Sequence, residues 1–236
     1  ENVGLIEVAN FSKHEFKGPD ARKFLDHIMA GRLPKPGRIS LSPMLSYRGK
    51  LCGDLTVACL DENEFMVFGS GAAQEMHRRW FESHLDKFNL SYSNRSDEYH
   101  GLSIAGPNSR KVLEKIVRDD VSNEKFKFRD SRRMFVGGVP AIINRISFTG
   151  ELGYEIYVAP HYQLKLYEEL MEAGKEFKIK PFGGRALMSM RLEKNWGAWT
   201  LDYRPDFTAK ETGLDAFINW DKEFIGKESA QKENSS

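Results

Sequence analysis

Two acidic residues stand out because they lie where β-strands are expected. Glu155 belongs to residues 145–157, in which β-forming residues at even spacing flank a glycine-containing turn. In hairpin register, Phe148 falls near Glu155 across the two strands. A carboxylate beside an aromatic ring suits a planar ligand with paired N–H donors, because its oxygens accept both hydrogen bonds while the ring offers a stacking face. The alternative is a solvated Glu155 and a core Phe148.

The second acid is Asp54, which precedes the β-forming run Leu55-Thr56-Val57. An aspartate in a buried strand is uncommon unless it is paired or functional. The alternative places Asp54 at a loop edge, where its carboxylate would bond to local backbone N–H groups. Arg191 is a third candidate, since it shares one side of a predicted helix over 185–194 with apolar residues. An arginine there indicates an anionic partner, unless its side chain snorkels to solvent.

Composition excludes several classes of partner. The 236 residues are 40% hydrophobic and 29% charged, with a net charge of +1. This balance is typical of a globular protein that binds neither nucleic acid nor an anionic membrane. No apolar run approaches the roughly 20 residues of a spanning helix, and the N-terminus lacks a basic leader pattern. We expect an intracellular protein, in the cytoplasm or, in a eukaryote, the mitochondrial matrix. The start without Met suggests a segment of a longer chain.

Metal and nucleotide chemistry are not expected. Cys52 and Cys59 have an odd separation, which points them to opposite faces of one strand, and the six histidines lack metal-ligand spacing. Residues 69–74 follow a strand and precede a helix, as a dinucleotide-binding loop would. Gln74, however, replaces the small residue needed for close packing there, and the preceding strands form a hairpin rather than a parallel β-α-β unit.

An internal repeat organises the chain. Residues 17–25 and 105–113 share one plan, a Gly-Pro turn followed by a helix with Asp20 or Asn108 at its start. After each helix the pattern predicts a strand pair and another helix, so each half reads β-α-β-β-α. The strand with Asp54 is then the counterpart of the strand ending near Phe148, which predicts a ligand site at a seam between the halves. The alternative is a repeat preserved only for folding.

The predicted fold is therefore α+β, with two tandem pseudo-symmetric β-α-β-β-α halves. The first half spans residues 1–90 and the second spans 91–182. Residues 183–236 supply a helix and an extension that complete the site.

Motifs spread along the chain resemble those of the T-protein (aminomethyltransferase) superfamily. They are Gly18-Pro19-Asp20-Ala21, Asp54-Leu55, Ile104-Ala105-Gly106-Pro107, residues 147–157, and Met190-Arg191-Leu192-Glu193-Lys194 followed by Ala198-Trp199. Within the superfamily, the chain is most similar to the folate-binding domain of dimethylglycine and sarcosine dehydrogenases. The resemblance implies the T-protein folate-binding fold, with the C-terminal barrel domain of that family absent from this sequence.

Carried over residue by residue, the resemblance gives each candidate a role. Asp54 matches the second, catalytic acid of an Asp-Asp-Leu motif, and Gly53 replaces the first acid. Glu155 matches a glutamate that grips the pterin, and Arg191 matches an arginine that helps to fix the cofactor. Phe148 matches a tyrosine lining the folate pocket, so the ring is kept without its hydroxyl.

The resemblance also implies an activity, namely tetrahydrofolate-dependent one-carbon transfer. The carbon would come from an N-methyl amine such as dimethylglycine or sarcosine and give methylene-tetrahydrofolate. A flavin-dependent oxidising domain or subunit is implied as a partner, because no flavin-binding segment is present. Two alternatives stay open, a non-catalytic folate-fold binding or regulatory protein and a demethylase of a methylated sulfur compound.

Overall fold

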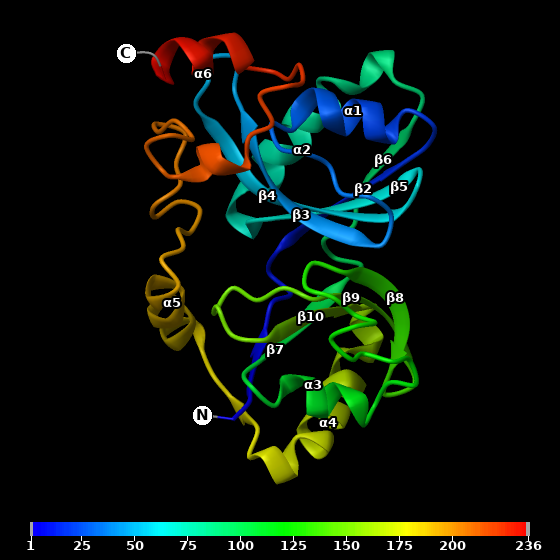
Figure 1. Cartoon of the computed structure of the whole chain (residues 1–236). Coiled ribbons are helices and arrows are strands. Elements are labelled where there is room, and N and C mark those ends of the chain that lie inside the picture. The colour runs from blue at the N-terminus through cyan, green and yellow to red at the C-terminus, as the bar shows by residue number, and fades with distance from the viewer. Residues whose placement is uncertain (1, 235–236) are drawn as a thin grey trace. The chain divides into compact units, whose positions relative to one another are not determined.

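The computed structural model describes residues 2–234, which form an α+β protein of two compact units (Figure 1). Unit 1 combines the N-terminal segment that ends at Asn10 with Ser96–Trp196. Unit 2 combines Phe11–Arg95 with the C-terminal segment that begins at Gly197. Each unit therefore draws on two separate stretches of the sequence and has its own sheet and hydrophobic core.

Unit 1 is built on a six-stranded sheet in the order β11-β1-β7-β10-β9-β8, antiparallel except where β1 meets β11. Its strands are β1 (Gly4–Glu7), β7 (His100–Ala105), β8 (Ser131–Val136), β9 (Val139–Asn144), β10 (Gly153–Val158) and β11 (Lys180–Pro181), and its α-helices are α3 (Ser109–Glu114), α4 (Gln163–Ala173) and α5 (Gly184–Glu193). Helices α3 and α4 cover one face, where Leu113 and Leu166 join Ile104, Ile143 and Ile156 in the core (Figure 1). The opposite face is left for polar side chains.

Unit 2 is built on a five-stranded antiparallel sheet in the order β3-β4-β5-β2-β6. Its strands are β2 (Ser12–Lys17), β3 (Arg38–Leu45), β4 (Leu51–Asp61), β5 (Glu64–Gly69) and β6 (Ser91–Asn94), and its α-helices are α1 (Ala21–Ile28), α2 (Gln74–Glu82) and α6 (Lys227–Asn234). Leu25 of α1 and Phe81 of α2 pack with Leu55, Val57 and Val67 of the sheet. Successive residues of β4 thus alternate between this core and the other face.

The internal repeat is present in the structure. The order β2-α1-β3-β4-β5-α2 in unit 2 recurs as β7-α3-β8-β9-β10-α4 in unit 1, and both sheets arrange these strands in the same way. Both turns use a Gly-Pro pair whose glycine has a φ that only glycine adopts readily, 137° at Gly18 and 129° at Gly106. Strand β4, which carries Asp54, corresponds to β9, as the repeat predicted.

The predicted β-α-β-β-α unit was wrong in one respect, because three strands rather than two separate the helices. The additional strands, β3 and β8, lie at one end of each sheet. Strand β3 alternates apolar and polar residues from Ile39 to Ser42 but then contains Pro43, and β8 begins Ser131-Arg132-Arg133, which interrupts any apolar alternation. Proline and charged residues are tolerated in such strands because one side of an edge strand makes no ladder hydrogen bonds.

The chain before the first Gly-Pro turn forms two strands, β1 and β2, which belong to different sheets. β1 pairs with β7 and β11 in unit 1, whereas β2 pairs with β5 and β6 in unit 2. The division predicted at 90/91 and 182/183 follows chain order, whereas the units of the structure each combine two segments. Within residues 2–234, no helix combines the length and apolar character that crossing a membrane requires.

Lys222 fixes the C-terminal segment of unit 2 to the end of α1. Its Nζ donates to the backbone carbonyls of Asp26 and Met29, each at 2.6 Å, and lies 3.2 Å from the Asp26 carboxylate. These carbonyls belong to the last turn of α1, where backbone acceptors lack partners inside the helix and a cation is favoured. One side chain therefore caps α1 and anchors a segment almost 200 positions away in the chain.

We expect Lys222→Met to lower the free energy of unfolding by roughly 1–3 kcal/mol, because it leaves the capped carbonyls without a donor. Lys165→Met is the matched control, since Lys165 makes only an exposed ion pair with Glu169 at 3.0 Å on α4. Its loss should cost about 0.5 kcal/mol or less. Urea unfolding of both variants checks this, and equal losses would contradict the capping role.

Candidate functional site

Glu155 lies at the centre of unit 1, on the sheet face opposite the hydrophobic core. On β10 it pairs directly with Ser103 of β7 and Asn144 of β9, and Ser131 of β8 follows on the far side of Asn144. All four side chains are buried. The sheet therefore carries a row of buried polar groups across four strands, which is unusual unless the groups are paired or used.

Tyr157 is the hydrogen-bonding partner of Glu155. It lies two residues further along β10, on the same face, and its hydroxyl donates to Glu155 Oε2 at 2.9 Å. The ring packs over Gly101, where a Cβ atom would come within 2.7 Å of it. Burial raises the pKa of Glu155 to about 7, while the Tyr157 hydrogen bond and the charge of Lys194 act to lower it. The carboxyl group is thus poised between its two protonation states near neutral pH.

The other carboxylate oxygen of Glu155 has no hydrogen-bond partner among the described residues. Within residues 2–234, Oε1 makes no hydrogen bond, and a carboxylate oxygen can accept two. A ligand presenting adjacent N–H donors could therefore bind Oε1 and share Oε2 with Tyr157. The amino-pyrimidine edge of a pterin has this pattern, so the donor set fits the cofactor implied by the sequence.

Phe148 is not the cross-strand neighbour of Glu155, and the predicted register was wrong. β9 ends at Asn144, which is the residue opposite Glu155, and residues 145–152 form an irregular connection in which Phe148 is half-buried. Local hydrogen bonds favour this loop over a strand, because Thr149 Oγ1 bonds to Ser147 Oγ at 2.7 Å and accepts from the Glu151 N–H at 3.3 Å.

Arg191 and Lys194 lie at the end of α5, next to the 145–152 loop. Arg191 is buried and donates to the Trp196 carbonyl at 2.8 Å, so its head group does not snorkel to solvent. Lys194 Nζ donates to the Ser147 carbonyl at 2.9 Å, and its positive charge acts on Glu155. Within unit 1 the structure therefore places Glu155, the loop that contains Phe148 and the end of α5 around Lys194.

Asp54 belongs to unit 2. It is the fourth residue of β4, opposite Pro43 of β3, on the face away from the core residues Leu55 and Val57. Burial raises the pKa of Asp54 to about 7, although its own backbone N–H acts to lower it. The backbone interaction expected of a loop-edge aspartate is thus present, but within a strand. A carboxyl group with this pKa can both give and take a proton near pH 7.

Tyr157 and Lys194 were not identified from the sequence. Tyr157 could have been, because strand alternation places residues 155 and 157 on one face. Lys194 follows Arg191 by three positions, which puts both on the same side of a helix. Its link to the 145–152 loop, however, depends on a long-range contact that no local pattern indicates.

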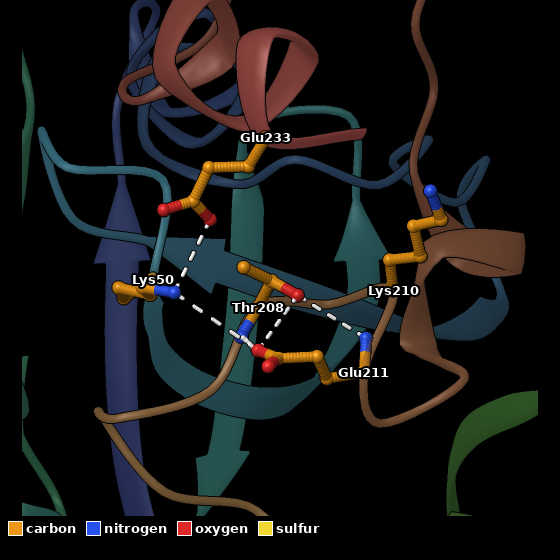
Figure 2. A pocket seen from close by; sticks show the side chains of 5 residues that line it. All are labelled: Lys50, Thr208, Lys210, Glu211 and Glu233. Carbon is orange, nitrogen blue, oxygen red and sulfur yellow. Dashed lines mark hydrogen bonds and ion pairs between the residues drawn. The ribbon is translucent and has the colours of Figure 1, made fainter. Parts of the chain in front are cut away.

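Unit 2 also has an open pocket of about 530 Å³, lined by Lys50, Thr208, Lys210, Glu211 and Glu233 (Figure 2). Its size suits a ligand, but ligand pockets are lined mainly by apolar side chains. Here Lys50 is shared between Glu233 at 3.2 Å and Glu211 at 4.0 Å, and Glu211 accepts from the Thr208 N–H at 2.7 Å. These contacts hold the 208–211 segment and α6 at the start of β4, a structural role.

Comparisons with known proteins agree with this architecture. The family model of the GCVT N-terminal domain matches residues 1–222. Mitochondrial dimethylglycine dehydrogenase of Mus musculus is 36% identical over 237 residues, covering 98% of this chain and 27% of the relative. The chain thus spans about a quarter of that relative's length.

Two solved structures share the fold. The glycine cleavage system aminomethyltransferase T from Bartonella henselae matches with a TM-score of 0.88 and 22% identity, over 99% of this chain and 63% of that chain. The heterotetrameric sarcosine oxidase from Corynebacterium sp. U-96 matches with a TM-score of 0.60 and 20% identity, over 77% of this chain and 88% of that chain. The predicted T-protein folate-binding fold is confirmed.

The raised pKa of Glu155 predicts how stability depends on pH. Between about pH 4.5 and pH 7 the folded chain holds a proton on Glu155 that the unfolded chain has lost. The contribution of Glu155 to stability therefore falls as pH rises through this window. Glu155→Gln removes the titration, so we expect this variant to gain roughly 1–3 kcal/mol relative to the unmodified protein on going from pH 5 to pH 8.

Urea unfolding at pH 5 and pH 8 measures this change. Glu151→Gln is the control, because Glu151 is exposed in the adjacent loop. If the free energy of unfolding changes equally between pH 5 and pH 8 in Glu155→Gln and in the unmodified protein, the prediction is wrong and the carboxyl group titrates in its ordinary range.

Proposed function

Since the chain belongs to the GCVT N-terminal domain family, we propose that it carries out tetrahydrofolate-dependent one-carbon transfer of the aminomethyltransferase type. Family membership confirms the resemblance inferred from the motifs. The observation that carries the proposal is Glu155, a buried carboxyl group with one oxygen hydrogen-bonded to Tyr157 and the other without a hydrogen-bond partner among the described residues.

Residues of unit 1 would bind the cofactor. Glu155 accepts hydrogen bonds from the amino-pyrimidine edge of the pterin, and Tyr157 fixes the orientation of its carboxylate. Phe148 offers its ring from the 145–152 loop, and Arg191 orders the end of α5 through the Trp196 carbonyl. When bound, tetrahydrofolate supplies two nitrogen nucleophiles, N5 and N10.

Asp54 would perform the chemical role. Bound tetrahydrofolate would supply N5 and N10 to take up the carbon of an N-methylene iminium ion, R₂N⁺=CH₂, in exchange for its two N–H hydrogens, and the products would be methylene-tetrahydrofolate, R₂NH and one proton. Asp54 stabilises the cation as a carboxylate and accepts the departing proton, a role that its pKa of about 7 supports.

An N-methyl amine such as dimethylglycine or sarcosine is the donor that we propose. The mouse relative is named as a dimethylglycine dehydrogenase and the Corynebacterium structure as a sarcosine oxidase. Converting N–CH₃ to N⁺=CH₂ removes two electrons and therefore needs an oxidant, for which we propose a flavin-dependent domain or subunit. The mouse relative is mitochondrial by name, which supports a matrix location if the host is a eukaryote.

A binding or regulatory protein without turnover is the second candidate. Two departures from the family motif favour it, the phenylalanine at position 148 and the glycine at position 53. A demethylase of a methylated sulfur compound is the remaining alternative, and it would pass on a methyl group without the oxidation that an amine donor requires. Calorimetry with tetrahydrofolate, followed by assays with amine and sulfonium donors, separates these candidates.

Substitution of the two acids should have opposite effects on binding and chemistry. Asp54→Asn should lower the single-turnover rate of methylene transfer by about 10²-fold or more, while tetrahydrofolate affinity changes by less than about tenfold. Glu155→Gln replaces an acceptor oxygen with a donor facing the pterin N–H groups. Affinity itself should then fall roughly 5- to 150-fold. Titration calorimetry and rapid-quench single turnovers measure the two quantities.

Asp61→Asn provides the matched control, because Asp61 is an exposed acid at the other end of β4. Weak binding by Asp54→Asn together with normal binding and slow chemistry in Glu155→Gln would invert the assignment. No change in either variant would place the site elsewhere. Tight binding without any transfer in the unmodified protein would favour the non-catalytic candidate.

A further inference from the structure

The part of β4 that carries Asp54 has a strand neighbour on one side only. β3 pairs with β4 from Leu51 to Cys59, whereas pairing between β5 and β4 begins at Thr56 and continues to Asp61. Backbone groups of residues 51–55 that point toward the β5 side need other partners, because unpaired backbone groups are costly inside a protein. The Cys52 carbonyl finds one in His77 of α2, whose Nε2 lies 2.9 Å from the carbonyl oxygen.

His77 fits closely against two glycines of the sheet. A Cβ atom on Gly53 would lie 2.9 Å from His77 Nε2, and one on Gly69 would lie 3.2 Å from Nδ1. The imidazole is 1% exposed, so it is packed as tightly as a core side chain. Because a carbonyl can only accept, Nε2 carries the ring proton and Nδ1 does not. The direction of the hydrogen bond is thereby fixed.

The surroundings of His77 keep this hydrogen bond in place across the neutral pH range. Burial lowers the pKa of His77 to about 4 and that of neighbouring His14 to about 3. The two rings meet edge to face with centroids 6.3 Å apart, and His14 Nδ1 bonds to the Tyr92 hydroxyl at 2.8 Å. The His77 ring is therefore held by the Cys52 carbonyl of the sheet and by the ring of His14, and both contacts restrict its movement.

We propose that His77 is a positioning residue for Asp54, acting by holding the Cys52 carbonyl and hence the backbone that carries the carboxyl group. Cys52 and Asp54 are alternate residues of one strand, so a shift at the carbonyl moves the carboxylate. Misplacement of a catalytic group by about 1 Å can cost about 10²-fold in rate. This inference rests on the catalytic role proposed for Asp54.

Two amide substitutions isolate the hydrogen bond from the packing of the ring. In His77→Gln the side-chain amide can reach the place of Nε2, so a donor to the Cys52 carbonyl is retained. In His77→Asn the amide ends near the place of Nδ1, and the carbonyl loses its donor. We expect the single-turnover rate to fall about 10- to 100-fold in His77→Asn and less than about 3-fold in His77→Gln, with tetrahydrofolate affinity unchanged in both.

Hydrogen exchange of the amides of residues 51–57, followed by mass spectrometry, gives a readout that does not depend on activity. Exchange should accelerate in His77→Asn and stay at the unmodified level in His77→Gln. Gly53→Ala supplies a third variant, since its methyl group would push Nε2 away while His77 itself remains. It should behave like His77→Asn, and it keeps the test valid if His77→Asn does not fold.

The outcomes separate the inference from the proposed function. Equal rates and equal exchange in His77→Gln and His77→Asn, with Gly53→Ala unchanged, would overturn the positioning role and leave only packing. If Asp54→Asn itself turns over normally, the function proposed for Asp54 fails, and the exchange data alone decide whether His77 holds the strand. Parallel loss of folate affinity in both His77 variants would also overturn the inference, because it would indicate general disruption.

Discussion

Burial of a carboxyl group within a sheet is the constraint on which the candidate site depends. Moving a charged carboxylate out of water is expensive. Because the protein supplies few partners to offset this cost, the neutral form is favoured and the pKa of the carboxyl group rises. At Glu155 one hydroxyl, from Tyr157, and the nearby charge of Lys194 offset part of the cost. An arginine paired directly with Glu155 would have held the group ionised and occupied. The arrangement instead leaves Glu155 Oε1 as an acceptor to which a ligand could donate a hydrogen bond.

The fold provides the surface that such a group needs. In each unit two helices cover one face of the sheet. Apolar side chains of the strands point toward these helices, and polar side chains of the same strands point to the other face. Strand alternation then decides which residues face the hydrophobic core, since Tyr154 and Ile156 belong to the core cluster whereas Glu155 and Tyr157 do not. A shift of one residue in register would exchange the two sets.

Local patterns predicted much of this arrangement. The Gly-Pro turns and the helices that follow them are short-range features that the structure confirms, and both acids lie on strands, as their local patterns indicated. Asp20 illustrates where local reasoning stops, because it precedes α1 as a cap should, yet its carboxylate accepts from the Asn89 N–H at 2.8 Å rather than from the helix. The edge strands, the place of Phe148 and the exchange of β1 into the other unit depend on tertiary pairing. A sequence pattern cannot rank those pairings, since an apolar alternation fits any sheet.

Departures from a family motif carry information when their surroundings are known. Gly53 replaces an acid in the motif, and from the sequence alone that loss argues against catalysis. In the structure the space beside Gly53 is filled by His77, which also lies close to Gly69. Gly53, Gly69 and His77 therefore pack together, and the imidazole of His77 occupies the space into which a side chain at position 53 would extend. The glycine at position 53 therefore leaves room for His77, and the missing acid does not by itself argue that Asp54 lacks a role.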